Sequence, residues 1–264
     1  MSEDLKHDIL GVMRFSYRAK SGFQATMAQE DLYVEKLYSR ERLQKRLKIF
    51  KILTLRSLRA QTFQNFRLII IVGEDFPKWA LAEIKTMVSN VSTIEVILLP
   101  QMDASAAQDL VYLEKRDPDA DIHTSFCLDD DDAFAIDWME KLDQIAQNSK
   151  DFIDVFGPLL VYPRNGLVFQ SLNDEPPIIN VHMKMPWAIG MALVTKPNSE
   201  ANVFKHGHLN MVDKFHSLAI ENDIGFIRTL QNDNDSDRYA KFRLSNAVVK
   251  HEKNFDLSNV HQIL

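Results

Sequence analysis

The chain has 264 residues, of which 45% are hydrophobic and 26% charged, a composition ordinary for a globular protein with a sizeable core. Its net charge of −6 gives no positive field that would attract nucleic acid or acidic lipid. The single cysteine, Cys127, excludes an intrachain disulfide and suits a reducing compartment. Because its neighbours are apolar, we expect a buried thiol rather than a nucleophile.

Residues 1–8 are polar and mixed in charge, without the apolar core of a signal peptide. No stretch approaches the roughly 18 uninterrupted apolar residues of a membrane-spanning helix. These features predict a cytoplasmic protein. Peripheral contact with the inner face of a membrane stays open, since enzymes that act on lipid-linked substrates can use small surface patches.

The first half of the chain alternates strand-like and helix-like segments. Short apolar runs predict strands at residues 9–15, 66–72, 93–99 and 122–128. Apolar residues at helical spacing predict helices at residues 40–58, 78–89, 104–115 and 133–147. This alternation with short connections predicts an α/β fold with a mainly parallel central sheet and flanking helices.

The second half has a less regular pattern. The composition predicts a strand at residues 152–162, a turn at 163–166 and a returning hairpin strand at 167–170. Further along it predicts two strands and a short helix between them, at residues 188–195, 211–219 and 225–230. No internal repeat or low-complexity linker divides the chain, so we expect one compact unit, 1–264.

Four consecutive aspartates, Asp129 to Asp132, follow the predicted strand 122–128. Side chains at the carboxyl ends of buried strands are where open α/β sheets collect ligands. Adjacent carboxylates repel each other unless a cation offsets their charge. Mg²⁺ and Mn²⁺ bind one or two carboxylates and share their other ligands with substrate phosphates. The alternative is a solvated acidic turn with a helix-capping aspartate, but a cap needs only one.

The chain has only 8 glycines and neither a G-x-G-x-x-G run nor a Walker A sequence. A bound nucleotide would therefore have its phosphates balanced by a metal rather than by a glycine-rich loop. Asp129 and Asp131 form a D-x-D pair, and Asp130 and Asp132 form an overlapping one, so the register is open. We favour Asp129 and Asp131 as metal and diphosphate contacts, with Asp130 directed toward the ribose or supporting the other two.

Four motifs stand out together: Arg14-Phe15-Ser16, residues 54–62, the four aspartates and Asn234-Asp235-Ser236. Together they resemble the bacterial rhamnosyltransferase family of GT-A nucleotide-sugar glycosyltransferases. The resemblance spans about residues 9–245. It implies a GT-A-like domain with a nucleotide-sugar-binding half, 8–147, and an acceptor-binding half, 148–264.

The resemblance also implies a reaction. The donor would be a dTDP- or UDP-sugar, the acceptor a glycan or lipid-linked hydroxyl, and the role surface polysaccharide synthesis with Mn²⁺ or Mg²⁺. Two alternatives stay open: another metal-dependent phosphate enzyme, such as a nucleotidyltransferase or phosphohydrolase, and a non-catalytic protein that keeps the GT-A fold.

Positions carried over from the family add donor-binding candidates. Arg14 and Phe15, at the end of the first strand, would border the base or the diphosphate. Glu74 and Asp75, after the second predicted strand, lie where this fold commonly binds base or ribose. The alternatives are a surface arginine at a strand end and an acidic helix cap ahead of Pro77.

Some GT-A enzymes complete the metal shell with a histidine from the C-terminal half. His206 and His208 are candidates by this resemblance, the alternative being loop histidines with no role. In the family a histidine precedes the Asn-Asp-Ser motif by a few residues, and here Gln231 stands in that place. A metal ligand at position 231 is therefore not expected.

Inverting sugar transfer needs a base that takes the proton of the acceptor hydroxyl. Carboxylates of the second half are the candidates, and the sequence does not choose among them: Asp213, Glu221, Asp223, Asp233 and Asp235. Residues 232–237 would form a loop over the diphosphate or, alternatively, a solvated turn. Trp187 would stack on an acceptor sugar or, as is commoner for a tryptophan, lie in the core.

Overall fold

Nine strands form one sheet in the part of the chain that the computed structural model describes, residues 5–20, 30–170 and 178–230. The strands are β1 (His7–Arg14), β2 (Arg67–Gly73), β3 (Ile94–Leu99), β4 (Ile122–Phe126), β5 (Ala133–Phe134), β6 (Leu159–Gln170), β7 (Ile178–His182), β8 (Ala192–Thr195) and β9 (His216–Leu230). Their order in the sheet is β3-β2-β1-β4-β8-β6-β9-β5, and β7 pairs with β6.

The strands of the first half pair in parallel, β3 with β2, β2 with β1, and β1 with β4. Strand β8 is antiparallel to both β4 and β6, whereas β6 and β9 are parallel to each other. The predicted α/β class is confirmed. Parallel pairing dominates the first half, and the sheet as a whole is mixed.

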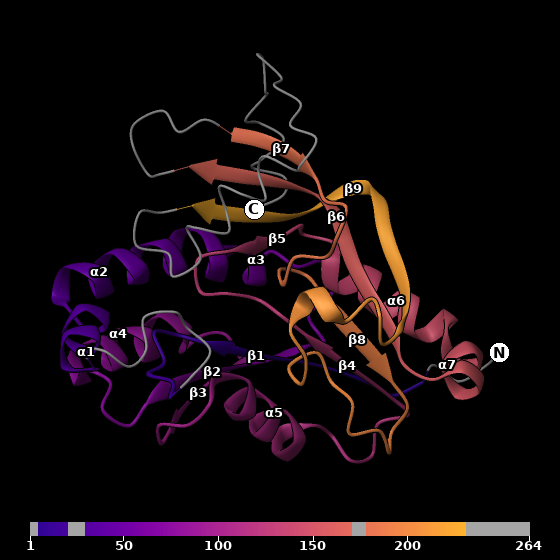
Figure 1. Cartoon of the computed structure of the whole chain (residues 1–264), viewed down its shortest axis with the longest axis horizontal. Coiled ribbons are helices and arrows are strands. Elements are labelled where there is room, and N and C mark those ends of the chain that lie inside the picture. The colour runs from indigo at the N-terminus through magenta and orange to yellow at the C-terminus, as the bar shows by residue number, and fades with distance from the viewer. Residues whose placement is uncertain (1–4, 21–29, 171–177, 231–264) are drawn as a thin grey trace.

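Helices cover both faces of this sheet (Figure 1). They are α1 (Glu30–Leu37), α2 (Arg40–Ile49), α3 (Leu55–Arg59), α4 (Lys78–Val88), α5 (Ala104–Lys115), α6 (Trp138–Asn148) and α7 (Lys150–Phe156). A π-helical segment, Phe50–Thr54, joins α2 to α3 into one continuous rod, and a 3₁₀ turn spans His208–Asn210. None of the described helices is long and apolar enough to cross a membrane.

Alternation along β1 shows how the sheet separates two layers of core. Side chains of successive strand residues point to opposite faces. Ile9 and Met13 join the cluster that contains the buried residues of α2, α3, α4 and α6. Leu10 and Val12 join the cluster on the other face, which includes α5. The helices α2 to α4 therefore lie on one side of β1, and α5 lies on the other.

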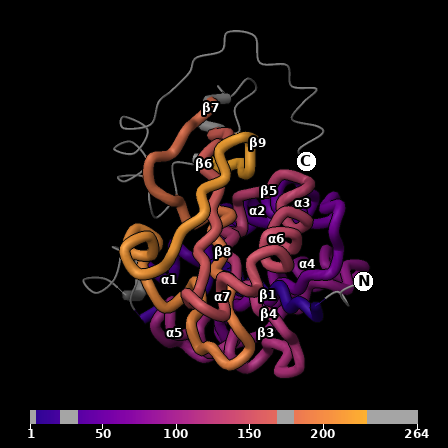
Figure 2. The backbone as a smooth tube through the Cα atoms, turned by 90° about the vertical axis from the view of Figure 1, so that its right-hand side faces the viewer, coloured from indigo at the N-terminus to yellow at the C-terminus, as the bar shows by residue number. Residues whose placement is uncertain are grey.

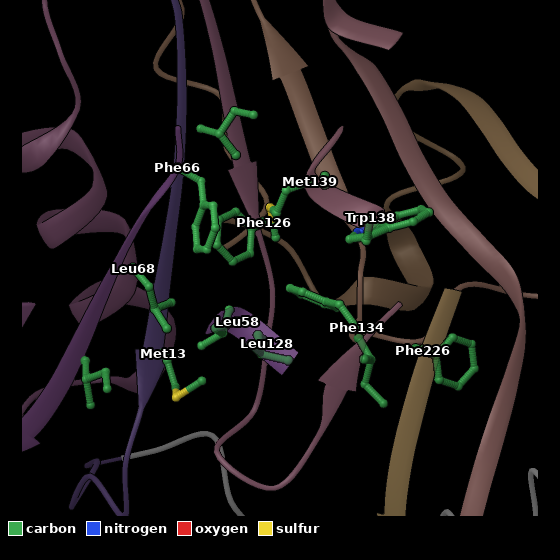
Figure 3. Packing of buried hydrophobic residues seen from close by; sticks show 14 of the residues in the cluster. Met13, Leu58, Phe66, Leu68, Phe126, Leu128, Phe134, Trp138, Met139 and Phe226 are labelled. Carbon is green, nitrogen blue, oxygen red and sulfur yellow. The ribbon is translucent and has the colours of Figure 1, made fainter. Parts of the chain in front are cut away.

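Buried rings and aliphatic side chains fix both ends of the aspartate segment. Phe126 and Leu128 precede it, Phe134 follows it, and all three are less than 4% exposed. Phe126 and Phe134 pack edge to face with their centroids 5.9 Å apart. Figure 3 shows these side chains directed into one core together with Leu58 of α3 and Met139 of α6. The acidic loop is thus fixed at both ends by buried apolar side chains, Phe126 and Leu128 before it and Phe134 after it.

Several boundaries in the second half differ from the sequence prediction. The strand predicted at 152–162 is wrong at its start, because Lys150–Phe156 forms α7 and buries only Ile153 of its apolar residues. Gly157, with φ of +89°, ends that helix in a conformation that glycine adopts without strain. The helix predicted at 133–147 begins only at Trp138, after the short strand β5.

The hairpin turn predicted at residues 163–166 is also wrong, because Leu159–Gln170 is one strand, β6. It runs parallel to β9, with register shifts between Pro163 and Gly166. Proline has no N–H for a strand ladder and is tolerated at such an irregularity. The helix predicted at 211–219 gives way to β9 from His216 onward, since pairing with β6 overrides the local pattern. Figure 2 shows β6 and β9 side by side, and β7 pairs with the C-terminal part of β6, from Asn165 to Phe169.

The expected division into halves 8–147 and 148–264 stays a prediction. One sheet runs through both halves, and β5 of the first pairs with β9 of the second.

Gly166 of β6 lies opposite Phe226 of β9. A Cβ at position 166 would come within 2.3 Å of the Phe226 ring, which is fully buried. We expect Gly166→Ala to destabilise the protein by about 1–3 kcal/mol, as overpacking of a core does. Chemical denaturation measures this cost. The control is Gly207→Ala, whose Cβ would meet only Asn210 Nδ2, at 3.9 Å. An equal unfolding free energy for both variants would contradict the packing described.

Asp8, in β1, has a buried carboxylate near the amino end of the strand. Burial alone would raise its pKa, but His123, whose Nδ1 lies 3.5 Å from Asp8 Oδ2, and hydrogen bonds from the Asp117 N–H and Arg67 outweigh burial and lower the pKa to about 2. A carboxylate with a depressed pKa stabilises the fold above its unfolded pKa, and this contribution is lost as pH falls through the folded pKa. It amounts to about 2 kcal/mol.

We therefore expect the unfolding free energy of the wild type to fall between about pH 4 and pH 2. In Asp8→Asn this part of the decline should be missing, by about 2 kcal/mol. Urea unfolding across that pH range measures the difference. Parallel pH profiles for the two proteins would show that Asp8 does not have the depressed pKa.

Candidate functional site

The carboxyl ends of β1 and β4 form a topological switch point. From β1 the chain continues to β2 on one side, whereas β4 lies on the other side of β1. Open α/β sheets bind ligands in the crevice outside the carboxyl ends of their strands at such a point. Arg14 ends β1 here, and Asp129 to Asp132 follow β4 after two residues, so the topology places the acidic loop at the site the fold favours.

The four aspartates differ sharply in their environments. Asp129 is exposed, whereas Asp130, Asp131 and Asp132 are 2%, 6% and 3% exposed. The Asp132 N–H donates to the Asp129 carbonyl, which makes the loop a tight turn. Three buried carboxylates in sequence are not a solvated acidic turn, and their charges need partners.

Arg46 of α2 supplies the principal counter-charge. Its Nη2 and Nε donate to the two carboxylate oxygens of Asp130, and its Nη1 donates to Asp131 Oδ2 at 2.8 Å. The Arg46 side chain is only 13% exposed. The sequence did not single out this residue, which lies on a helix with several other basic side chains.

The end of β9 holds the opposite side of the loop. The Thr229 N–H donates to Asp132 Oδ1 at 3.2 Å, and Thr229 Oγ1 donates to the Asp131 carbonyl at 2.8 Å. The neighbouring Arg228 lies over the ring of Trp187, 4.8 Å from its centroid. Its positive charge acts to lower the pKa of both Asp131 and Asp132.

Burial nevertheless dominates the electrostatics of the loop. It raises the pKa of Asp131 to about 6, although Arg46 opposes the change, and it raises the pKa of Asp132 well above its usual value. Both shifts mean that the ionised forms of Asp131 and Asp132 are unfavourable where they lie, first because burial removes water and then because neighbouring carboxylates repel them. A cation bound at this place would favour the ionised forms.

The residues present fit a hard divalent cation. Asp129 is exposed, and the bond to Arg46 engages only one of the two carboxylate oxygens of Asp131. Within residues 5–20, 30–170 and 178–230, no three His, Cys, Asp or Glu side chains gather around one metal position. Mg²⁺ and Mn²⁺ commonly use one or two protein carboxylates and take their remaining ligands from phosphates and water. Asp129 and Asp131 are suited to such a shared site.

The motif at residues 54–62 holds the chain where it leaves the acidic loop. Ser57 Oγ accepts from the Phe134 N–H at 3.4 Å. The Gln61 amide donates to the Ala135 carbonyl at 2.8 Å and accepts from the Met139 N–H at 3.0 Å. Ser57 and Gln61 of this motif therefore fix the segment that follows the acidic loop.

The donor candidates at the end of β1 separate into two kinds. Phe15 is fully buried and packs edge to face against Phe50 and Phe76, so its ring belongs to the core and offers no face to a base. Arg14 is half-buried beside the site, and its charge opposes the burial that raises the pKa of the partly buried Cys127 thiol. Ser16 has φ of +44° and accepts from Arg42 Nη1 at 3.0 Å.

Asp75 follows β2 and has a fixed but accessible carboxylate. It accepts from Arg18 Nη1 at 3.0 Å and from the Tyr38 hydroxyl at 2.9 Å, and 42% of its side chain remains exposed. It does not cap α4, whose N-cap is Pro77 and has no side-chain cap bond. Glu74 beside it is exposed. The capping alternative is thus excluded for Asp75, and a base or ribose contact stays a prediction.

The two histidine candidates are not gathered with the acidic loop into a metal-binding group of the described chain. The His206 ring packs near Phe215, and its pKa is lowered by burial and by the charges of Lys214 and Lys205. His208 begins the 3₁₀ turn. A role of His206 or His208 as a metal ligand stays a prediction.

The described candidates for the catalytic base have different surroundings, and none is singled out by its contacts. Asp213 is exposed, Glu221 pairs with Arg164, and Asp223 pairs with Lys141. The other two candidates, Asp233 and Asp235, lie outside the described residues, as do the loop 232–237 and Gln231. Trp187 is 3% exposed and packs against Phe226, which fits the core alternative.

Comparison with known proteins now gives the class of the molecule. A family model described as "Putative rhamnosyl transferase" matches residues 8–242, which is most of the 264-residue chain. The chain belongs to this family and is thus a member of a glycosyltransferase family. A search of curated proteins gives no match.

Solved structures of related architecture have low similarity. S. aureus TarS 1-349 in complex with UDP has 10% identity and a TM-score of 0.42, covering 92% of this chain and 67% of that one. Mannosyltransferase PcManGT from Pyrobaculum calidifontis, in complex with GDP-Man and Mn²⁺, has 6% identity and a TM-score of 0.47, covering 92% and 62%. We draw neither substrate nor chemistry from likenesses this low.

Proposed function

We propose that the chain is a metal-dependent glycosyltransferase. It transfers a sugar, with rhamnose as the candidate that the family name provides, from a dTDP- or UDP-linked donor to a hydroxyl of a glycan or lipid-linked acceptor. The role that follows is surface polysaccharide synthesis on the cytoplasmic side. The observation that carries the proposal is the acidic loop at the switch point, with Asp129 exposed and three buried carboxylates behind it.

Each side chain has a role that its position supports. Asp129 and Asp131 would hold Mn²⁺ or Mg²⁺, which when bound stabilises the negative charge of the departing diphosphate. Arg14, beside the loop, would contribute a charge-assisted bond to a phosphate. Asp75 would accept a hydrogen bond from base or ribose, since Arg18 and Tyr38 already fix its orientation.

In the proposed transfer one bond to the anomeric carbon forms and one breaks. The acceptor oxygen forms a bond to the anomeric carbon as the bond from that carbon to the diphosphate oxygen breaks. The hydroxyl proton passes to a carboxylate of the second half if the configuration inverts. Asp213, Glu221 and Asp235 are the first bases to test. In the structure Glu221 is engaged with Arg164, so it would have to leave that ion pair to accept a proton.

Nucleotide release from a panel of nucleotide sugars tests the proposal. The protein is incubated with Mn²⁺ and with UDP-, dTDP- or GDP-linked sugars, and the nucleoside diphosphate released is measured. We expect release that requires Mn²⁺ and is abolished in Asp131→Asn, while Asp154→Asn on α7 serves as a surface control. Pyrophosphate release from a nucleoside triphosphate with a sugar phosphate would favour a nucleotidyltransferase. Release of inorganic phosphate alone would favour a phosphohydrolase, and binding without turnover a binding protein.

A further inference from the structure

Arg46 contacts two of the four aspartates from a distant part of the chain. We propose that Arg46 is a positioning residue of the donor site, which fixes the acidic loop so that Asp129 and the second oxygen of Asp131 are left for the metal and diphosphate. This inference rests on the proposed function, because it assigns Arg46 a task in metal and nucleotide binding. The task is exerted through Asp130 and Asp131, without contact between Arg46 and the substrate.

The bonds of Arg46 divide the four carboxylates by role. Both oxygens of Asp130 are engaged by Arg46, so of the two roles that the sequence left open, a ribose contact or support of the other aspartates, this geometry favours support. Asp131 Oδ2 accepts a hydrogen bond from Arg46 Nη1, and within the described residues no hydrogen bond to Asp131 Oδ1 is found. Asp132 is held by Thr229. Anchored and available carboxylates therefore alternate along the loop.

The guanidinium group is committed to these carboxylates. Its Nε, Nη1 and Nη2 all donate to Asp130 or Asp131, and the side chain is largely buried. A direct contact of Arg46 with a donor phosphate would require at least one of these bonds to break. The geometry thus favours positioning over direct phosphate binding.

Arg46 is itself held rigidly. On either side of it, Leu43 and Leu47 of α2 are buried in the core. Ser39 caps the start of this helix, and its side chain accepts from the Arg42 N–H. The rod formed by α2, the π-helical segment and α3 then continues to Ser57, which binds the Phe134 N–H. One rod therefore holds the acidic loop through Arg46 and the segment that follows the loop through Ser57.

The shape of the arginine side chain matters as much as its charge. A planar guanidinium presents donors in a fixed fork that bridges two neighbouring carboxylates, whereas a lysine ammonium is a compact point charge on a flexible stem. Arg46→Lys consequently keeps the counter-charge but loses the bridge. This variant separates positioning from charge balance.

The test measures binding of Mn²⁺, alone and with UDP or dTDP, by electron paramagnetic resonance of the free ion. We expect Arg46→Lys to weaken Mn²⁺ binding about tenfold, the size of effect that residues supporting a metal ligand have. The double variant Arg46→Met/Asp130→Leu removes both members of the Arg46–Asp130 ion pair, so that of the aspartates in the loop only Asp131 loses a partner, its bond from Arg46 Nη1. We expect it to fold and to lose affinity to a similar extent.

The matched control is Arg67→Lys, which alters another arginine paired with a buried aspartate, Asp8, elsewhere in the sheet. We expect its Mn²⁺ affinity to equal that of the wild type. Wild-type affinity in both Arg46→Lys and the double variant would overturn the positioning role while leaving the proposed function intact. If the wild type itself binds no Mn²⁺ with or without either nucleotide, the proposed function and this inference fail together.

Discussion

Replacement of Asp131 by asparagine is expected to reduce Mn²⁺-dependent binding of a nucleoside diphosphate by about 100-fold, at the upper end of losses for a perturbed metal site. A neutral amide is a far poorer ligand than a carboxylate for a hard divalent cation. The introduced amide retains a carbonyl oxygen that can accept the bond from Arg46, so the loop keeps its principal contact. Calorimetric titration with UDP or dTDP, with and without Mn²⁺, measures the loss.

The same substitution is expected to leave the fold as stable as the wild type or slightly more so. Burial raises the pKa of Asp131 to about 6, which shows that its charged form is unfavourable where it lies. An amide of the same shape removes that cost. Loss of binding together with retained stability is the signature of a residue kept for function. Asp154→Asn is the control, and equal affinities in the two variants would exclude Asp131 from the site.

Replacement of Arg46 by methionine is expected to destabilise the protein by about 3–5 kcal/mol, because removing one member of a buried ion pair leaves an uncompensated charge. Asp130, which is 2% exposed, would lose the partner of both its oxygens. Urea unfolding near neutral pH gives the free energy of unfolding for each protein.

The double variant Arg46→Met/Asp130→Leu supplies the internal control. Replacing both members of a buried ion pair with apolar side chains of similar volume is often neutral. We therefore expect it to recover the part of the stability loss that comes from Asp130, whereas Asp131 still lacks its bond from Arg46. An Arg46→Met protein as stable as the wild type would mean that the ion pair is not formed in solution.

The parallel half of the fold followed closely from the sequence. Strands buried on both faces are continuous apolar runs, so the segment predicted at 66–72 is found as Arg67–Gly73. The predicted rod at 40–58 is present as α2, the π-helical segment and α3. The location of the acidic loop also followed, because the end of a buried strand is readable from one segment of chain.

The second half could not be predicted in the same way, because pairing between distant segments decides its structure. Residues 152–156 have strand-like composition, yet they form α7 and leave Val155 and Phe156 exposed. β6 and β9 owe their length to pairing with each other. No local pattern announces a partner so far along the chain, and strand preference depends on such context.

Arg46 escaped prediction for a related reason. It lies 84 residues before Asp130 and shares its helix with other basic side chains, including Arg42 and Lys45. The usable signal was the charge of the loop itself, since several adjacent aspartates on a buried turn require a cation from somewhere. The helix predicted at 40–58 is rich in basic residues, but only the structure selects Arg46 among them by its burial and geometry.

The central claim is that the acidic loop binds a nucleoside diphosphate together with a divalent metal. The direct test is calorimetric titration of the folded wild type with UDP and with dTDP, in Mn²⁺ and again after chelation of the metal. We expect the protein to bind at least one of the two nucleotides with micromolar affinity in Mn²⁺ and to lose that binding on chelation. Failure to bind either nucleotide, or equal affinity with and without metal, would contradict it.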